Sequence, residues 1–274
     1  TDGILAPKEI RKGNASGEGR IYFNNATLRP ASGASSGFFS GLDLAEIQSG
    51  GLTIDGTSAV TIAQPLSGSG SLTKIGSAKV TLTGSNSYTG TTTISNGTLA
   101  IGSGGSIASS SIVIANGATF DVSAAGGFAL ASGQILARNA LSGVGNVNGS
   151  LTLNSGAGLS FQVNGTNGNV GTLAISGNLT VNSNTVSVHV TGPALGIGVY
   201  PLASYTGSLS GLFNPVPVIS GSGLETGLTS KIRAQSGVVE LVVHVPRHGI
   251  SAANIHVVQH DLANKTNSIT LSMP

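Results

Sequence analysis

The chain lacks several features that commonly stabilise extracellular and ligand-binding domains. Its 274 residues include no cysteine, no tryptophan and one methionine. Charged side chains occupy 8% of positions, whereas an ordinary soluble domain has about 25%. The absence of cysteine excludes a disulfide scaffold and a thiolate metal site. Backbone hydrogen bonds and apolar burial must therefore hold the fold together.

The few charges are nearly balanced and thinly spread. The formal net charge is +2, and Asp121 and Arg138 are the only charged residues between Lys79 and Glu225. A basic patch that could bind a nucleic acid is therefore not expected. No apolar run approaches the roughly 20 residues of a membrane-spanning helix, and no leader pattern opens the chain. We expect that a leader was removed and that the chain is a piece of a longer protein.

Apolar and polar residues alternate with a period of two through most of the chain. Val80 and Leu82 alternate with Thr81 and Thr83, and the run TVSVHV repeats the pattern from position 185. Alternate side chains of a strand face opposite sides, so each run predicts an apolar inner face and a small polar outer face. The fold class predicted is all-β. Helical spacing is weak and confined to residues 43–47 and 134–140.

Strand-like runs are paired around short turn dipeptides that recur at a nearly regular interval. These dipeptides are Asn96-Gly97, Asn116-Gly117, Ser132-Gly133, Ser155-Gly156 and Ser176-Gly177. One reading is a hairpin turn, which would give an antiparallel sandwich. The other is a corner between two sheets of a parallel β-helix with coils of about 20 residues. The regular interval favours the β-helix, because stacked coils repeat one unit whereas a sandwich does not.

The ends differ from the middle and predict three regions. Residues 1–20 hold seven of the 22 charged residues and are expected to cap or connect the first coil, since a terminal repeat needs a polar outer face. Residues 21–245 are the predicted parallel β-helix. Residues 246–274 contain the runs NIHVVQ and NSITLSM around the turn-like DLANKT. They are expected to form a hairpin or the first strands of another module.

The segment 68–107 resembles a repeat of bacterial surface proteins. The pattern reads Gly68-x-Gly70-x-Leu72-x-Lys74-x-Gly76, then Val80-x-Leu82-x-Gly84-x-Asn86-x-Tyr88-x-Gly90-x-Thr92, then Gly97-x-Leu99. It is similar to the passenger-associated transport repeat, also called the autotransporter-associated β-strand repeat, and departs from it at Ala78, where the family usually has glycine. The flanks extend the resemblance over roughly residues 18 to 245.

The resemblance implies a right-handed parallel β-helix that is secreted or displayed on the surface of a Gram-negative bacterium. The repeat is associated with the export and stepwise folding of long autotransporter passengers. On this basis we expect an extracellular structural or adhesive protein that forms a rigid rod. Self-association end to end into a filament or matrix is expected, with residues 250–274 as a candidate strand donor to a neighbouring subunit.

The alternative is a glycan-binding or polysaccharide-degrading β-helix. Its only candidate carboxylate cluster is Asp43, Glu46 and Asp55, for which ordinary turn and surface roles are favoured. The match to G-x-S-x-G at residues 33–37 lacks the strand and helix that a nucleophile elbow needs. His256 and His260 would lie roughly 13 Å apart on a strand, too far for one metal.

The sequence therefore predicts no catalytic, cofactor-binding or metal-binding residue, no cofactor and no enzymatic activity. Contact with glycans or a cell surface is a further expectation. It could involve outward threonines or stacking tyrosines. The candidates are Thr81, Thr83, Thr91, Thr93, Thr180, Thr185, Tyr88, Tyr200 and Tyr205.

Overall fold

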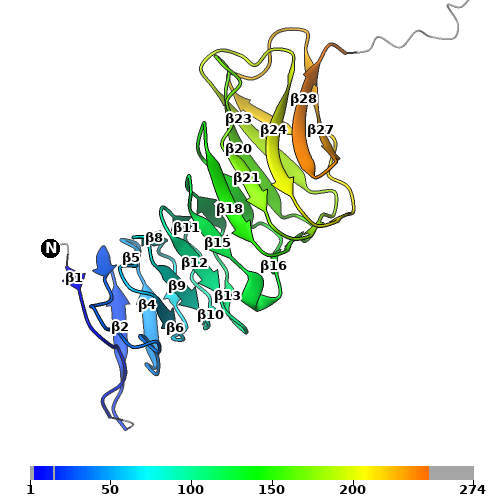
Figure 1. The fold of residues 1–274 in the computed structure, drawn as a ribbon. Helices are drawn as coiled ribbons and strands as arrows, with labels where there is room; N and C mark the ends of the chain where they lie inside the picture. Colours follow the sequence, from blue (N-terminus) through cyan, green and yellow to red (C-terminus); the bar gives the residue numbers. More distant parts are fainter. Residues whose placement is uncertain (1–2, 15, 247–274) are drawn as a thin grey trace, which may run out of the picture.

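A computed structural model describes residues 3–14 and 16–246. The described chain contains 28 strands and one short 3-10 turn, Ser123–Ala125. The strands stack as successive rungs along one axis (Figure 1). The prediction of an all-β fold built as a parallel solenoid is confirmed. The two runs noted in the predicted C-terminal extension lie outside the described residues.

Each rung passes through three faces, which we name A, B and C. Face A is a ten-stranded sheet in the order β1 (Ile4–Leu5), β3 (Ala26–Leu28), β5 (Leu52–Asp55), β8 (Leu72–Ile75), β11 (Thr92–Ile94), β14 (Ser111–Ile114), β17 (Ile135–Arg138), β20 (Gly158–Asn164), β23 (Thr185–Thr191) and β26 (Val218–Gly221). Face B is a nine-stranded sheet in the order β6 (Val60–Ile62), β9 (Lys79–Leu82), β12 (Thr98–Ile101), β15 (Thr119–Asp121), β18 (Val144–Asn148), β21 (Thr172–Ile175), β24 (Gly198–Tyr205), β28 (Val238–His244) and β27 (Thr229–Gln235).

Face C consists of three smaller parallel sheets. They contain β2 (Arg20–Phe23), β4 (Leu44–Ile47) and β7 (Ser67–Gly68); β10 (Ser85–Asn86) and β13 (Ser106–Ile107); and β16 (Phe128–Leu130), β19 (Leu151–Leu153), β22 (Leu179–Thr180) and β25 (Leu209–Ser210). Most apolar side chains of the three faces point inward and form one continuous core, whereas a few, such as Tyr22, Ile135 and Val218, are exposed.

The pairing register aligns like side chains in columns. On face A the outward residues Thr53, Thr73 and Thr93 are consecutive partners. One residue further along each strand, Ile54, Lys74 and Ile94 form an inward column. Alternation within each strand and pairing between strands therefore build the core together, as the period of two predicts.

Rung length is constant in one region and grows in another. The outward column of face A advances by equal steps through Thr53, Thr73, Thr93 and Val113. Every later step of this column, through Ala137, Ser160 and Ser187 to Val218, spans more of the chain than those first steps do. The predicted coil length therefore describes only the rungs from β5 to β14, because the step from Thr27 to Thr53 before them is also longer. Later rungs are longer because their strands and corners lengthen.

The turn dipeptides are corners, but not all at the same place. Gly97 and Gly117 follow face A strands, and Gly133 and Gly156 precede them. These four glycines have φ between 64° and 82°, a left-handed conformation that other residues adopt at a cost. The fifth dipeptide lies between β21 and β22, and Gly177 does not have positive φ. The five dipeptides whose regular spacing favoured a solenoid therefore lie at three different corners: from face A to face B, from face C to face A, and from face B to face C.

Both weak helix predictions are wrong, because each segment forms a strand. Residues 43–47 contain β4, in which Ala45 and Ile47 are buried. Residues 134–140 contain β17, in which Leu136 and Arg138 are buried. Pairing with the neighbouring rungs overrides the local helical spacing, as is common where tertiary contacts compete with propensity. No described helical segment is long and apolar enough to cross a membrane.

The two ends close differently. At the N-terminal end, β1 pairs in parallel with β3, so residues 1–20 contain a strand of face A. At the C-terminal end, β28 runs antiparallel between β24 and β27. The last two strands of region 21–245 therefore depart from the parallel arrangement.

Candidate functional site

The three acids predicted as the only carboxylate cluster lie in different surroundings. Asp43 accepts hydrogen bonds from Lys12 Nζ (3.0 Å) and from the Gly19 amide (2.7 Å). Those bonds, with that from Lys12 the larger cause, hold the pKa of Asp43 below its ordinary value. Glu46 lies on β4 of face C and Asp55 on β5 of face A. Glu46 and Asp55 therefore lie on different faces of the solenoid.

Asp55 forms an ion pair with Arg29. Its carboxylate accepts a hydrogen bond from Arg29 Nε at 2.8 Å and is nearly buried. Among residues 3–14 and 16–246, no three side chains of histidine, aspartate or glutamate are grouped to hold a metal. His189 is outward on β23 with Ser220 as its partner, and His256 and His260 lie outside the described residues.

The residues of the repeat pattern are found inside the solenoid. Lys74 is fully buried, and its ammonium donates hydrogen bonds to three backbone carbonyls: Ile75 (2.7 Å), Gly76 (2.8 Å) and Asn96 (3.1 Å). Asn96 belongs to the next rung, so Lys74 ties two rungs together at the corner from face A to face B. Burial lowers the pKa of Lys74 to about 8, and nearby Asp55 partly offsets this effect.

Asn86 performs a similar task on face C. Its side-chain amide donates to the carbonyls of Gly84 (2.8 Å) and Ser106 (2.9 Å), and its oxygen accepts from the Leu66 amide (2.9 Å). Leu66 and Ser106 lie on the preceding and following rungs. One asparagine therefore satisfies backbone groups on three successive rungs.

Tyr88 fills the core beside a chain of hydroxyls. Its hydroxyl lies 2.8 Å from Thr92 Oγ1, which also bonds Ser109 Oγ, and all three residues are fully buried. Burial raises the pKa of Tyr88 above its ordinary value, and the hydroxyl bonds oppose this. Tyr88 therefore serves the core and is not available to stack on a sugar.

Gly90 of the pattern lets neighbouring rungs approach. A Cβ atom at this position would lie 2.3 Å from the Gly70 carbonyl oxygen of the preceding rung. Such a contact with backbone cannot relax cheaply. Lys74, Asn86 and Gly90 of the repeat pattern thus specify contacts between rungs.

The comparison with known families agrees with this geometry. Residues 72–101, from the start of β8 to the end of β12, match the family model of the passenger-associated-transport-repeat. The chain contains this repeat. No curated protein matches the chain.

Sequence reasoning missed the largest fully buried side chain, Arg138. Its guanidinium donates to the carbonyls of Ile114 (3.0 Å), Ser142 (2.9 Å) and Thr172 (3.2 Å). These carbonyls lie on three successive rungs, and burial lowers the pKa of Arg138. Its isolation in an uncharged stretch, on the inward position of an alternating run, was the available signal.

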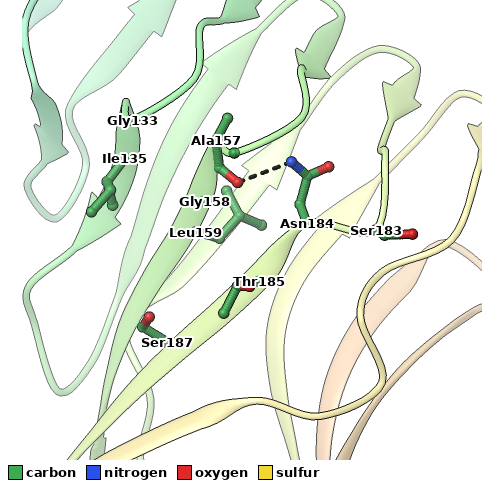
Figure 2. A pocket seen from close by; sticks show the side chains of 10 residues that line it. Gly133, Ile135, Ala157, Gly158, Leu159, Ser183, Asn184, Thr185 and Ser187 are labelled. Atoms are coloured by element: carbon green, nitrogen blue, oxygen red, sulfur yellow. Dashed lines mark hydrogen bonds between the residues drawn. The ribbon is translucent and has the colours of Figure 1, made fainter.

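A shallow groove lies on the outer surface of face A (Figure 2). The groove has a volume of about 250 Å³ and mixes aliphatic, hydroxyl and backbone groups. It is lined by Gly133, Ile135, Gly156, Ala157, Gly158, Leu159, Ser183, Asn184, Thr185 and Ser187. The Asn184 amide points to the Ala157 carbonyl at 2.9 Å, so this buried side chain supports the groove wall.

The predicted outward threonines are distributed over several faces. Thr93 lies outward on face A, in one column with Thr73, Thr53 and Thr27, whereas Thr81 lies on β9 of face B. Only the pairing register shows this column of threonines, because each member lies on a different rung and far from the others in the sequence.

Proposed function

We propose that the chain is a stiff, non-catalytic rod segment of a secreted or surface-displayed passenger, with a structural or adhesive role outside a Gram-negative cell. Copies associate end to end into a filament or matrix, and residues 250–274 supply a strand to the neighbouring copy. Contact with glycans or a cell surface takes place along the nearly uncharged part of the rod between Lys79 and Glu225.

The observation that supports this proposal best is the continuous, in-register core with the repeat pattern at its centre. Lys74, Asn86 and Tyr88 all serve contacts inside the solenoid. Parallel ladders pair each rung with its neighbours, which makes bending or local unfolding costly and limits the access of proteases. A rod of this kind suits a spacer that must persist outside the cell without disulfides.

Location can be tested on intact cells of the source bacterium. Antibodies raised against residues 3–246 should label unpermeabilised cells or material released into the medium. A periplasmic protein on the same cells serves as the control, because it should be labelled only after permeabilisation. Label that follows this control would contradict surface display.

Association can be tested by sedimentation velocity and electron microscopy of the purified chain over a range of concentrations. We expect end-to-end oligomers that disappear when residues 250–274 are deleted, while the β-sheet circular dichroism remains. Oligomers that persist in the deletion variant would exclude this segment as the donor.

The groove on face A favours glycan binding as a second candidate function. Hydroxyl groups of Ser183, Thr185 and Ser187 line it beside the half-exposed Ile135. Gly158→Thr would fill the groove, since a Cβ there meets only the Thr185 carbonyl, at 3.3 Å, and φ is not positive. Binding to insoluble polysaccharides that is present in the parent chain and absent in this variant would support the second function. No binding by either chain would exclude it for those glycans.

A further inference from the structure

Face A ends on an open strand at the C-terminal end of the rod. β26 pairs with β23 on one side, and no described strand pairs with its other side. Three aliphatic side chains near this edge are exposed: Leu212 (78%), Val216 (66%) and Val218 (53%). An open apolar edge of this kind invites pairing with another strand.

Face B, in contrast, is closed at the same end. β28 turns back and fills the space between β24 and β27. The outer strand β27 is partly covered, because the Ile232 amide donates to the Pro215 carbonyl at 2.8 Å. Among the described strands, an antiparallel one therefore protects the end of face B, and none covers the end of face A.

The core is also open near the loop that leads to β26. An apolar hollow of about 260 Å³ lies between the last face B strand and the loop that leads to face A. It is lined by Leu209, Leu212, Phe213, Pro215, Ile232 and Ala234. Ile232 and Ala234 lie on the face of β27 that points to the core, since their partners Leu241 and Val239 are fully buried. A further face A strand would place its inward side chains over this hollow.

The chain itself can supply such a strand. It leaves β28 at His244, which pairs with Thr229. The segment 222–228 already bridges the gap from Gly221, the end of β26, to Thr229. The segment 245–253 is longer than that bridge and can therefore cross the same gap in the opposite direction. The next residues, 254–259, read NIHVVQ and can place Ile255 and Val257 on one strand face.

We propose that residues 254–259 pair with the free edge of β26 in their own chain, antiparallel to it, with Ile255 and Val257 over the apolar hollow. This strand continues the reversal that β28 begins on face B and closes face A. The inference deepens the proposed end-to-end association but does not require it. In a single chain the strand closes its own rod, and donation to a neighbour exchanges the same contacts between copies.

Engineered disulfides test this arrangement directly, because the chain has no cysteine of its own. Ser220 lies outward on β26, opposite His189. We would combine Ser220→Cys with cysteine at position 254, 256 or 258 in three separate variants of the full chain. The control pairs Gln162→Cys with the same positions, because Gln162 occupies the same outward column two strands inside the sheet.

We expect at least one Ser220 pair to form an intramolecular disulfide at low micromolar concentration, seen as a faster monomer band without reductant, and no Gln162 pair to do so. A disulfide needs Cβ atoms roughly 4 Å apart, but oxidation also traps brief encounters. A randomly sampling tail would therefore link the Gln162 pairs as well, and the control separates this case from a fixed strand. Covalent dimers in place of the fast monomer would assign the strand to a second copy. No disulfide at any of the three positions would overturn the proposal outright.

Hydrogen exchange supplies a second readout that does not depend on assembly. The amides of β26 alternate between β23 and the free edge, and the Ser222 amide donates to Val190 on the β23 side. The amides of Ile219 and Gly221 therefore point to the free edge. They should be protected in the full chain and should exchange at least tenfold faster in Val257→Pro. Asn267→Pro, which lies beyond the proposed strand, should leave them unchanged. Equal exchange in the parent chain and in Val257→Pro would contradict the pairing, whether or not copies associate.

Discussion

The rungs from β5 to β14 and the rungs from β17 to β26 have the same three faces. They differ at the corner from face A to face B, both in its length and in the buried cation that bonds its carbonyls. In the first region the corner from face A to face B after β8 spans residues 76–78, and the ammonium of Lys74 satisfies it. In the second region the corner after β17 spans residues 139–143, and the guanidinium of Arg138 satisfies it.

Both cations occupy the same inward column of face A, with Ile94 and Ile114 between them. A lysine offers a compact ammonium with three donors, whereas an arginine offers five donors in a planar fork. At the short corner Lys74 bonds carbonyls on two rungs, and at the longer corner Arg138 bonds carbonyls on three. We therefore expect the length of a corner and its buried cation to be linked at these two positions.

Arg138→Met should give the largest effect, because it removes the hydrogen bonds to the buried Ile114 carbonyl and to the partly buried carbonyls of Ser142 and Thr172. We expect a loss of about 4 kcal/mol in the free energy of unfolding, measured by urea titration. Arg138→Lys should recover less than half of the free energy of unfolding that Arg138→Met loses, since one ammonium cannot span three rungs. Arg11→Met, which removes an exposed arginine paired with Glu9, is the control. Full recovery by Arg138→Lys would break the link between corner length and cation.

Gly90→Ala should be nearly as damaging, because its Cβ would clash with the backbone of the preceding rung. We expect a loss of about 3 kcal/mol from the strain of overpacking. Gly158→Ala is the matched control in the long-rung region, where a Cβ meets nothing closer than 3.3 Å. The midpoints of urea unfolding of the two variants check this difference, and equal midpoints would show that close rung approach is not limiting at Gly90.

Lys74→Met should destabilise the short-rung region by about 2 to 3 kcal/mol through unsatisfied carbonyls, somewhat less than Arg138→Met. Removal of a buried charge offsets part of the loss. Hydrogen exchange of the amides in residues 72–101 should show the weakening locally. Exchange that rises around Arg138 and not around Lys74 would contradict the view that each cation stabilises its own corner independently.

The titration of Lys74 should be visible in the pH dependence of the free energy of unfolding. Its pKa is about 8 in the folded protein and 10.5 as the ordinary value, so the unfolded chain binds more protons between these values. The free energy of unfolding should therefore rise as pH increases from about 8 to 10. Urea titrations across this range check the slope, which should be absent in Lys74→Met. A slope of the same size in both proteins would assign it to another group.

Tyr88→Phe should have the smallest effect. The hydroxyls of Thr92 and Ser109 can still bond each other after the change, so no buried group is left alone. We expect a loss of about 1 kcal/mol in the free energy of unfolding, typical of one neutral hydrogen bond. A loss as large as that of Lys74→Met would show that the hydroxyl chain, and not the corner cation, dominates the short-rung region.

Much of the fold could be predicted from the chain because strand alternation and glycine corners are local signals. Val80 and Leu82 were correctly placed inward, and four of the five turn dipeptides have the left-handed glycine expected at a corner. The reversal of β28 was not predicted, because its alternating pattern fits a parallel and an antiparallel strand equally well. The candidate carboxylates were named from the sequence, but only the fold showed that Glu46 and Asp55 lie on different faces of the solenoid.

The alternation, the corners, the nearly uncharged stretch between Lys79 and Glu225 and the repeat can all be read from the sequence, because each depends on neighbouring residues. Which polar residues belong inside depends instead on contacts between rungs. Lys74 bonds the carbonyl of Asn96 on the next rung, and Arg138 bonds that of Thr172, still further along the chain. Whether a buried charge stabilises or destabilises depends on such distant partners, and the stacking of rungs is what brings them together.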